Sequence, residues 1–117
     1  MIKIPRGNTL DLAIKITDAS GNPYVLQEND TAIFTVKTND CAFEKPIIQK
    51  FLTADNYNDT GELVIKITPE DTIDKTKGDY KYDFAVCVNG CDFYTTILAD
   101  VFRILPALSC KGDLTNA

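Results

Sequence analysis

The side chains that could perform acid–base or metal chemistry in this 117-residue chain are carboxylates and thiols, because the sequence contains no histidine. Serine occurs only at Ser20 and Ser109. Without an imidazole base, neither a Ser–His nor a Cys–His nucleophile can be assembled, and a zinc site built on imidazole is excluded as well. We therefore expect a protein that is not an enzyme and that has no catalytic residue, no metal and no cofactor.

The polar loop Asp55–Glu62 is the best candidate for a metal site. Oxygen-bearing side chains stand at Asn56, Asn58 and Thr60, and Gly61 follows them. A calcium loop of this spacing needs a bidentate glutamate at its twelfth position, which here is Ile67. We therefore favour a solvated hairpin loop, with calcium binding as the alternative.

Three carboxylates, Asp71, Asp74 and Asp79, lie close together in the sequence. Two carboxylates can act as an acid–base pair when burial drives their pKa values apart. Here Lys75 and Lys77 are interleaved with them, which is typical of an exposed turn. We expect capping and solvation rather than catalysis, and Asp71 fits the capping role best.

The four cysteines do not have the spacing of a metal site; they are Cys41, Cys87, Cys91 and Cys110. Between the second and third of them stands Asn89-Gly90, a strong signal for a two-residue hairpin turn. Such a turn pairs Val88 with Cys91, so that the Cys87 and Cys91 side chains point to opposite faces. The sequence thus predicts free thiols and no Cys87–Cys91 disulfide.

Charge and hydropathy limit the partners and the location of the chain. The net charge is -5 and the isoelectric point is near 4.5, whereas nucleic-acid binders need a basic stripe. No apolar run has the length of a signal peptide or a membrane span. We expect a soluble protein made in a cytoplasm, with no nucleic acid and no membrane insertion among its interactions.

Alternating apolar and polar residues dominate the chain and predict strands rather than helices. The predicted strands cover residues 10–16, 31–37, 46–52, 63–67, 80–88 and 91–104. The exception is Thr68–Thr72, where Pro69 suits the first position of a short helical turn. The pattern predicts an all-β, antiparallel β-sandwich of about seven strands over residues 1–106, followed by a flexible tail over residues 107–117.

The hairpin around Asn89-Gly90 assigns side chains to two faces. The two-residue turn places Phe93 inward with Tyr82 and Phe84, whereas Phe102 and Ile104 have the opposite parity. A bulge near Ala99–Val101 would restore the inward direction of these later residues, and the alternative is a strand that is buried on both faces at its end. The outward residues of the hairpin are Ala85, Cys87, Tyr94 and Leu98. Together with Ile33 and Val64 they predict an apolar exterior that could serve as a protein interface; scattered surface apolar residues are the alternative.

The segment Gly78-Asp79-Tyr80 resembles the corner of immunoglobulin domains, in which a tyrosine enters a late strand and its hydroxyl bonds to upstream backbone. The tryptophan of antibody domains is missing. The sequence therefore predicts an immunoglobulin-like sandwich.

Over residues 2–106 the chain resembles the immunoglobulin-like N-terminal domain of baseplate upper proteins from tailed phages and prophages of Gram-positive bacteria. The resemblance rests on five motifs in order: Ile4-Pro5-Arg6-Gly7-Asn8-Thr9, Leu12–Ile16, Asp30–Lys37, Ile65–Thr72 and Gly78–Phe84. In the first of them the family often reads Arg-Gly-Asp-Thr, so Asn8 is a departure. The resemblance implies a virion protein of the baseplate or tail fibre, acting through contacts with other phage structural proteins or with its own copies, and no catalysis.

A carbohydrate- or cell-surface-binding sandwich is the alternative function. Sugar sites use exposed aromatic rings, and most aromatic residues of this chain fall on predicted core faces. The remaining candidates are Tyr24, Tyr57 and Tyr94.

Overall fold

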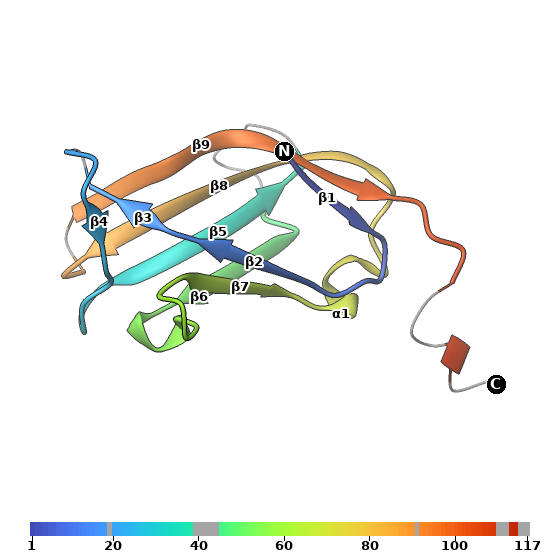
Figure 1. The fold of residues 1–117 in the computed structure, drawn as a ribbon. Coiled ribbons are helices and arrows are strands. Elements are labelled where there is room, and N and C mark those ends of the chain that lie inside the picture. Colours follow the sequence, from blue (N-terminus) through green and yellow to red (C-terminus); the bar gives the residue numbers. More distant parts are fainter. Residues whose placement is uncertain (19, 39–44, 91, 110–112, 115–117) are drawn as a thin grey trace.

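The computed structural model describes residues 1–18, 20–38, 45–90, 92–109 and 113–114, leaving aside the side chains of Thr96 and Leu98. Within these residues the chain forms an all-β sandwich, as the alternating pattern predicts (Figure 1). Its strands are β1 (Ile2–Pro5), β2 (Leu10–Ile14), β3 (Ile16–Thr17), β4 (Pro23–Tyr24), β5 (Thr31–Lys37), β6 (Ile48–Leu52), β7 (Leu63–Ile67), β8 (Gly78–Val88) and β9 (Asp92–Leu105). Two short helical turns, η1 (Ala54–Asn56) and α1 (Pro69–Thr72), flank β7.

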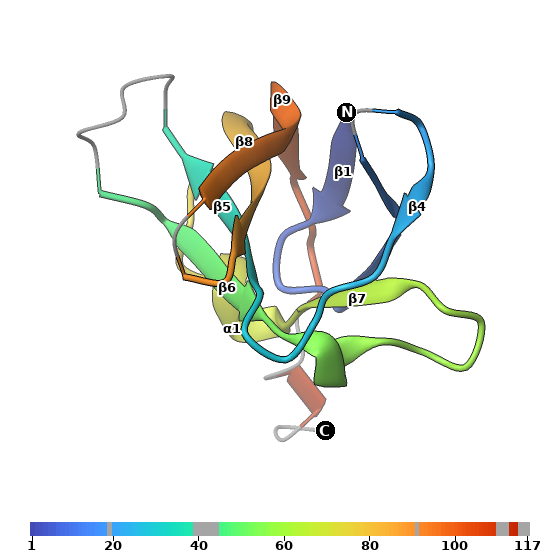
Figure 2. The ribbon, with the colours of Figure 1, turned by 90° about the vertical axis from the view of Figure 1, so that its left-hand side faces the viewer.

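The larger layer is a five-stranded sheet in the order β1-β9-β8-β5-β6. The β2–β7 pair belongs to the facing layer (Figure 2), and the small β3–β4 pair lies at one end of the sandwich (Figure 1). The expectation of about seven strands, all antiparallel, needs two corrections within the described residues. The predicted strand 10–16 is split at Lys15 into β2 and β3, and β1 runs parallel to β9.

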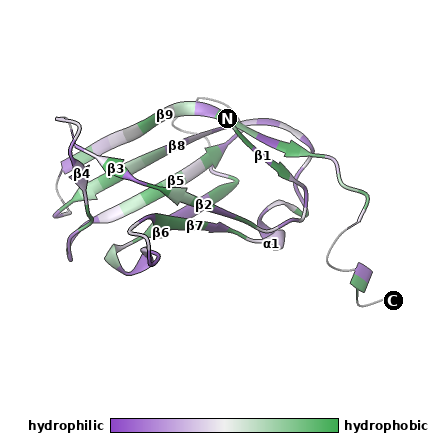
Figure 3. Ribbon diagram, in the orientation of Figure 1, coloured by the Kyte–Doolittle hydropathy of each residue, from purple (hydrophilic) through white to green (hydrophobic). Residues whose placement is uncertain are grey.

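The core lies between the two layers. Phe34, Phe84 and Phe102 from the five-stranded sheet are completely buried, and Leu63 and Ile65 of β7 are equally buried opposite them. The rings of Phe34 and Phe102 lie 6.3 Å apart, within the range of favourable aromatic pairs. Figure 3 shows the apolar colour concentrated along strands such as β2, β7 and β1. Period-two alternation thus identifies the inward residues of the central strands.

The helical turn after β7 is confirmed and is capped as predicted. Pro69 occupies the first turn of α1, and the Asp71 side chain accepts hydrogen bonds from the Thr68 backbone N–H at 2.7 Å and from the Thr68 hydroxyl at 3.1 Å. Thr72 is buried, and its Oγ1 accepts a hydrogen bond from the backbone N–H of Gly7 at 2.8 Å. Gly7 has a φ of 78°, a conformation that favours glycine, so the turn after β1 is fixed against α1.

The β8–β9 hairpin differs from the predicted register. Val88 pairs with Asp92 and Cys87 pairs with Phe93, so three residues, 89–91, separate the strands instead of two. Positive φ values at Asn89 and Gly90 allow the tight reversal. The prediction that Phe93 faces inward is wrong, because one extra loop residue reverses the face of the residues that follow.

Two irregularities interrupt the pairing of β9 with β8. The partner of Tyr82 is Asp100, that of Phe84 is Ile97 and that of Ala85 is Thr95. The register therefore slips by one residue twice, once next to the predicted bulge near Ala99–Val101 and once closer to the hairpin turn. The two slips cancel, because each reverses the face of the residues that follow it. Phe102 and Ile104 are buried because the three-residue loop already turns the even-numbered residues on both sides of the slips inward. A single bulge that restores the inward direction, as predicted, is therefore not what the structure shows.

The predicted tyrosine corner is present. The Tyr80 hydroxyl donates a hydrogen bond of 2.6 Å to the backbone carbonyl of Thr76, four residues upstream. This contact is a feature of immunoglobulin-like sandwiches, and it ties the loop after α1 to the start of β8.

Candidate protein interface

The five-stranded sheet has a second face, turned away from the β2–β7 layer. The residues that alternate with the core residues of β5, β6, β8 and β9 lie there. Strand register brings four of them into direct cross-strand contact in two pairs: Ile33 opposite Phe51, and Cys87 opposite Phe93. Ala85 lies between, because it pairs with Ile33 on one side and with Thr95 on the other. We call Ile33, Phe51, Cys87 and Phe93 the outer apolar patch.

The two phenylalanines dominate the exposed part of this patch. Phe51 and Phe93 each have an exposed fraction of 64%, whereas Ile33 and Cys87 are half-buried. Cys87 is a free thiol. An exposed phenylalanine keeps a large apolar surface in contact with water, and burying that surface in a partner is favourable. The patch therefore has the chemistry of a protein-binding surface.

The four interface residues expected from the sequence differ in the face on which they lie and in their exposure. Ala85 and Cys87 lie on the outer face, but Ala85 is only 2% exposed and offers little contact area. Tyr94 is 57% exposed, yet it pairs with Val86 and so lies on the opposite side of the sheet from the patch. The side chain of Leu98 lies outside the described residues.

Phe51 and Phe93 are the two residues that sequence reasoning missed. Phe51 belongs to a short apolar run, residues 46–52, in which alternation is hard to see because Ile47 and Ile48 are adjacent. For Phe93, the two-residue turn predicts a core position. A three-residue loop built around Asn89-Gly90 would have reversed the assignments of Phe93 and Tyr94.

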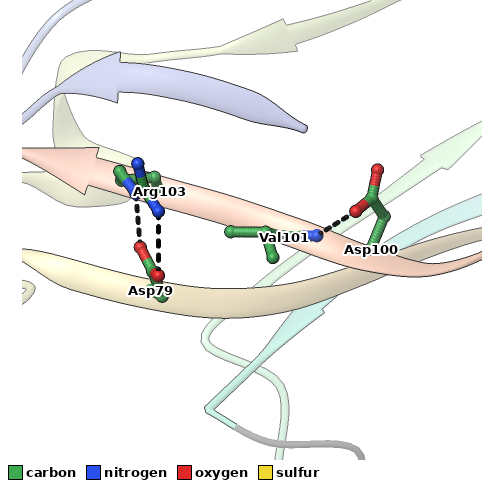
Figure 4. A network of polar contacts seen from close by, with 4 residues as sticks. All are labelled: Asp79, Asp100, Val101 and Arg103. Atoms are coloured by element: carbon green, nitrogen blue, oxygen red, sulfur yellow. Dashed lines mark hydrogen bonds and ion pairs between the residues drawn. The ribbon is translucent and has the colours of Figure 1, made fainter.

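The other half of the outer face is charged. Figure 4 shows Arg103 of β9 beside Asp79 of β8, with an Nε–Oδ1 distance of 2.6 Å and a second hydrogen bond from Nη2 to Oδ2 at 3.1 Å. This paired guanidinium holds the pKa of Asp79 below its usual range. Asp100 pairs with Tyr82 and so lies on the inner side of the sheet, where its side chain accepts a hydrogen bond from the Val101 N–H at 2.8 Å. The Asp79–Arg103 pair thus lies on the same outer face as the apolar patch, toward the opposite ends of β8 and β9.

The one buried carboxylate among the described residues is Asp30, which is 1% exposed. It accepts hydrogen bonds from the Tyr24 hydroxyl, from the Gln27 backbone N–H at 2.9 Å and from the Asn89 backbone N–H at 3.0 Å. The Tyr24 hydrogen bond and the two backbone donors lower the pKa of Asp30, although burial opposes this. The same hydrogen bond raises the pKa of Tyr24 to about 12. Through these three hydrogen bonds Asp30 fastens the β8–β9 turn to the β4–β5 connection.

The loop proposed as a calcium site is held by its own hydrogen bonds. Asn58 Oδ1 accepts from the N–H groups of Thr60 and Glu62 and from the Thr60 hydroxyl. The Asn56 side chain accepts from the Thr53 N–H at 2.8 Å. These oxygens serve the hairpin loop itself. Over the described part of the chain, no group of three histidine, cysteine or acidic side chains is placed to hold a metal ion.

The three clustered carboxylates have separate partners. Asp71 lies 2.8 Å from the Lys50 ammonium, and Asp74 lies 3.1 Å from that of Lys75. Burial disfavours the charge of Asp71, but the donors from Lys50 and Thr68 outweigh it and lower its pKa. The structure therefore does not bring these carboxylates together as an acid–base pair.

Two of the three tyrosines considered for sugar binding are used in packing. The Tyr24 hydroxyl binds Asp30, and the Tyr57 hydroxyl accepts a hydrogen bond from the Leu26 N–H at 2.9 Å. Both rings are half-buried against the core. Tyr94 alone of the three is highly exposed.

The free thiol predicted at Cys87 is confirmed. Cys41, Cys91 and Cys110 lie outside the described residues. Neither helical turn in the described ranges has the length and apolar character needed to span a bilayer. Comparisons with family models, with curated proteins and with solved structures found no match to this chain.

Proposed function

We propose that this chain is a non-enzymatic structural module that works by protein–protein contact, in a phage or prophage baseplate or tail-fibre assembly. The single observation that carries the contact role is the outer apolar patch, in which Phe51 and Phe93 are each 64% exposed. The phage assignment is supported by the motif resemblance over residues 2–106 and by the sandwich fold that the resemblance implies.

The patch is suited to a protein partner for a physical reason. Aromatic residues are enriched in the buried centres of interfaces, and charged residues are depleted there and gather at the rim. Here the two phenylalanines supply the most exposed apolar surface of the patch, and the Asp79–Arg103 pair lies on the same face of the sheet. The partner is another structural protein of the particle or a second copy of this chain.

Co-expression with the proteins encoded beside this chain tests the proposal, with assembled mass measured by size exclusion and light scattering. We expect a complex with the wild-type chain that Phe93→Lys abolishes. Tyr94→Lys is the matched control, because Tyr94 is the next residue, is similarly exposed and points to the other side of the sheet. Loss of the complex in both variants, or a wild-type chain that associates with none of these proteins, overturns the proposal.

The alternative is a carbohydrate- or cell-surface-binding module. The exposed rings of Phe51, Phe93 and Tyr94 supply aromatic platforms for it. A glycan array with the purified protein discriminates the two functions: reproducible binding that Phe93→Lys or Tyr94→Lys abolishes favours the alternative. Neighbouring genes give an independent indication, since tail and lysis genes favour the first function, and secretion and cell-wall genes favour the second.

A further inference from the structure

A groove of about 490 Å³ lies at the end of the sandwich that carries α1, far from the β8–β9 turn (Figure 1). It is formed by the turn after β1, by the loop between α1 and β8, and by the chain that leaves β9. Its volume lies within the range of ligand pockets and is far larger than a single inorganic anion requires.

The groove carries an excess of positive charge on an acidic protein. Arg6, Lys75 and Lys77 line it, against one carboxylate, Asp74. Asp74 is already paired with Lys75 at 3.1 Å. Arg6 is half-buried, and no side-chain hydrogen bond or ion pair of Arg6 or Lys77 is found within the described residues. The whole chain has a net charge of -5, so the groove is locally positive on a protein that is negative as a whole.

The backbone that presents these cations is fixed in place. The Arg6 N–H donates to the Leu105 carbonyl at 2.9 Å, and the following N–H, that of Gly7, donates to Thr72 Oγ1. On the other wall, the Lys75 N–H bonds to the Thr72 carbonyl at 2.9 Å, and the Tyr80 hydroxyl holds Thr76. A preformed site loses less entropy on binding than a loop that must first be ordered.

The remaining lining is apolar. Ile73 is 43% exposed, Leu108 is fully exposed, and Pro106 and Ala107 lie beside them. A free phosphate or sulfate would leave this apolar surface in water, whereas a peptide with acidic and aliphatic side chains would cover both parts. We propose that the groove binds an acidic, leucine-containing peptide segment of a partner protein, with carboxylates against Arg6 and Lys77 and an aliphatic side chain against Ile73. This contact is independent of the outer apolar patch.

The test uses the full chain and a fluorescein-labelled peptide in which aspartate alternates with leucine, with binding followed by fluorescence anisotropy. We expect Arg6→Glu with Lys77→Glu to weaken binding by about tenfold or more. The matched control is Lys15→Glu with Lys66→Glu, which changes the net charge equally at exposed sites outside the groove and should alter affinity by less than about twofold. If the double glutamate variant does not fold, Arg6→Gln with Lys77→Gln replaces it.

Two further peptides separate the contributions of charge and apolar contact. A peptide with asparagine in place of aspartate should not bind, and one with serine in place of leucine should bind more weakly. Absence of wild-type binding, equal weakening in the control variant, or displacement by inorganic phosphate as readily as by unlabelled peptide overturns the proposal. Concentration-dependent self-association that Arg6→Glu with Lys77→Glu abolishes would instead assign the groove to a second copy of this chain, and overturns it as well.

Discussion

The two faces of the five-stranded sheet carry the same residue type in opposite environments. Phe34 and Phe84 point toward the β2–β7 layer and are completely buried, whereas Phe51 and Phe93 point away from it and are 64% exposed. The first pair lowers the free energy of the folded chain. The second pair adds little to that stability, because its surface stays in water until a partner covers it. The alternation of side chains thus separates a face that stabilises the fold from a face that, in the function we propose, binds a partner.

The largest expected effect comes from truncating the inner face. Phe84→Ala should lower the free energy of unfolding by about 3–5 kcal/mol, because it removes a buried ring and leaves a cavity. The same truncation on the outer face, Phe51→Ala, should change it by less than about 0.5 kcal/mol. Urea denaturation measures both. Similar losses for the two variants would show that Phe51 contributes to the folded core, which contradicts its assignment to an interface.

Substitution of the buried carboxylate Asp30 should have the next largest effect on the free energy of unfolding. Asp30→Asn keeps the shape of the side chain but replaces one acceptor oxygen by a donor, which must face either the Gln27 N–H or the Asn89 N–H. Leaving a buried N–H without an acceptor costs about 1–3 kcal/mol. We expect a loss of that size by urea denaturation at neutral pH, with the fold retained by circular dichroism. An unchanged midpoint would mean that Asp30 does not hold the β8–β9 turn.

The pH dependence of stability tests the same network. Because the pKa of Asp30 is lowered on folding, its contribution is present above the ordinary carboxyl value of about 4 and is lost as pH falls through the lower folded value. The difference between the wild type and Asp30→Asn should therefore shrink on acidification. The pKa of Tyr24 is raised to about 12, so its contribution is complete below about pH 10 and is lost as pH rises toward 12. A difference that stays constant from pH 7 to 2 contradicts the Asp30 assignment.

A smaller effect is expected where the tyrosine corner fixes the loop between α1 and β8. Tyr80→Phe removes only the hydroxyl that donates to Thr76 and should lower the free energy of unfolding by about 1 kcal/mol. Tyr94→Phe is the control, since no hydrogen bond of the Tyr94 hydroxyl is found within the described residues. Equal midpoints for Tyr80→Phe and the wild type would show that the corner adds nothing to stability.

Local patterns in the sequence predict the inner face better than the outer one. The inward positions of Phe34 and Phe84, the turn at Pro69 and the corner at Tyr80 all depend on residues a few positions away. The face of Phe93 depends on loop length, and a one-residue error reverses it. The burial of Asp30 depends on Asn89, which is 59 residues distant. The parallel β1–β9 pair likewise joins the two ends of the domain, so neither contact has a local signal.

The smallest expected effect concerns the charged half of the outer face. Arg103 and Asp79 form two hydrogen bonds, but both side chains are substantially exposed to solvent, and such pairs add little to stability in salt. Asp79→Ala should therefore leave the urea midpoint unchanged within error at physiological ionic strength. If the pair forms part of the rim of the interface, the same variant should slow association with the partner, and added salt should reduce the difference from the wild type. A clear loss of stability without a change in association would show that the charged half of the outer face contributes to folding. Only the apolar half of the outer face would then be reserved for association.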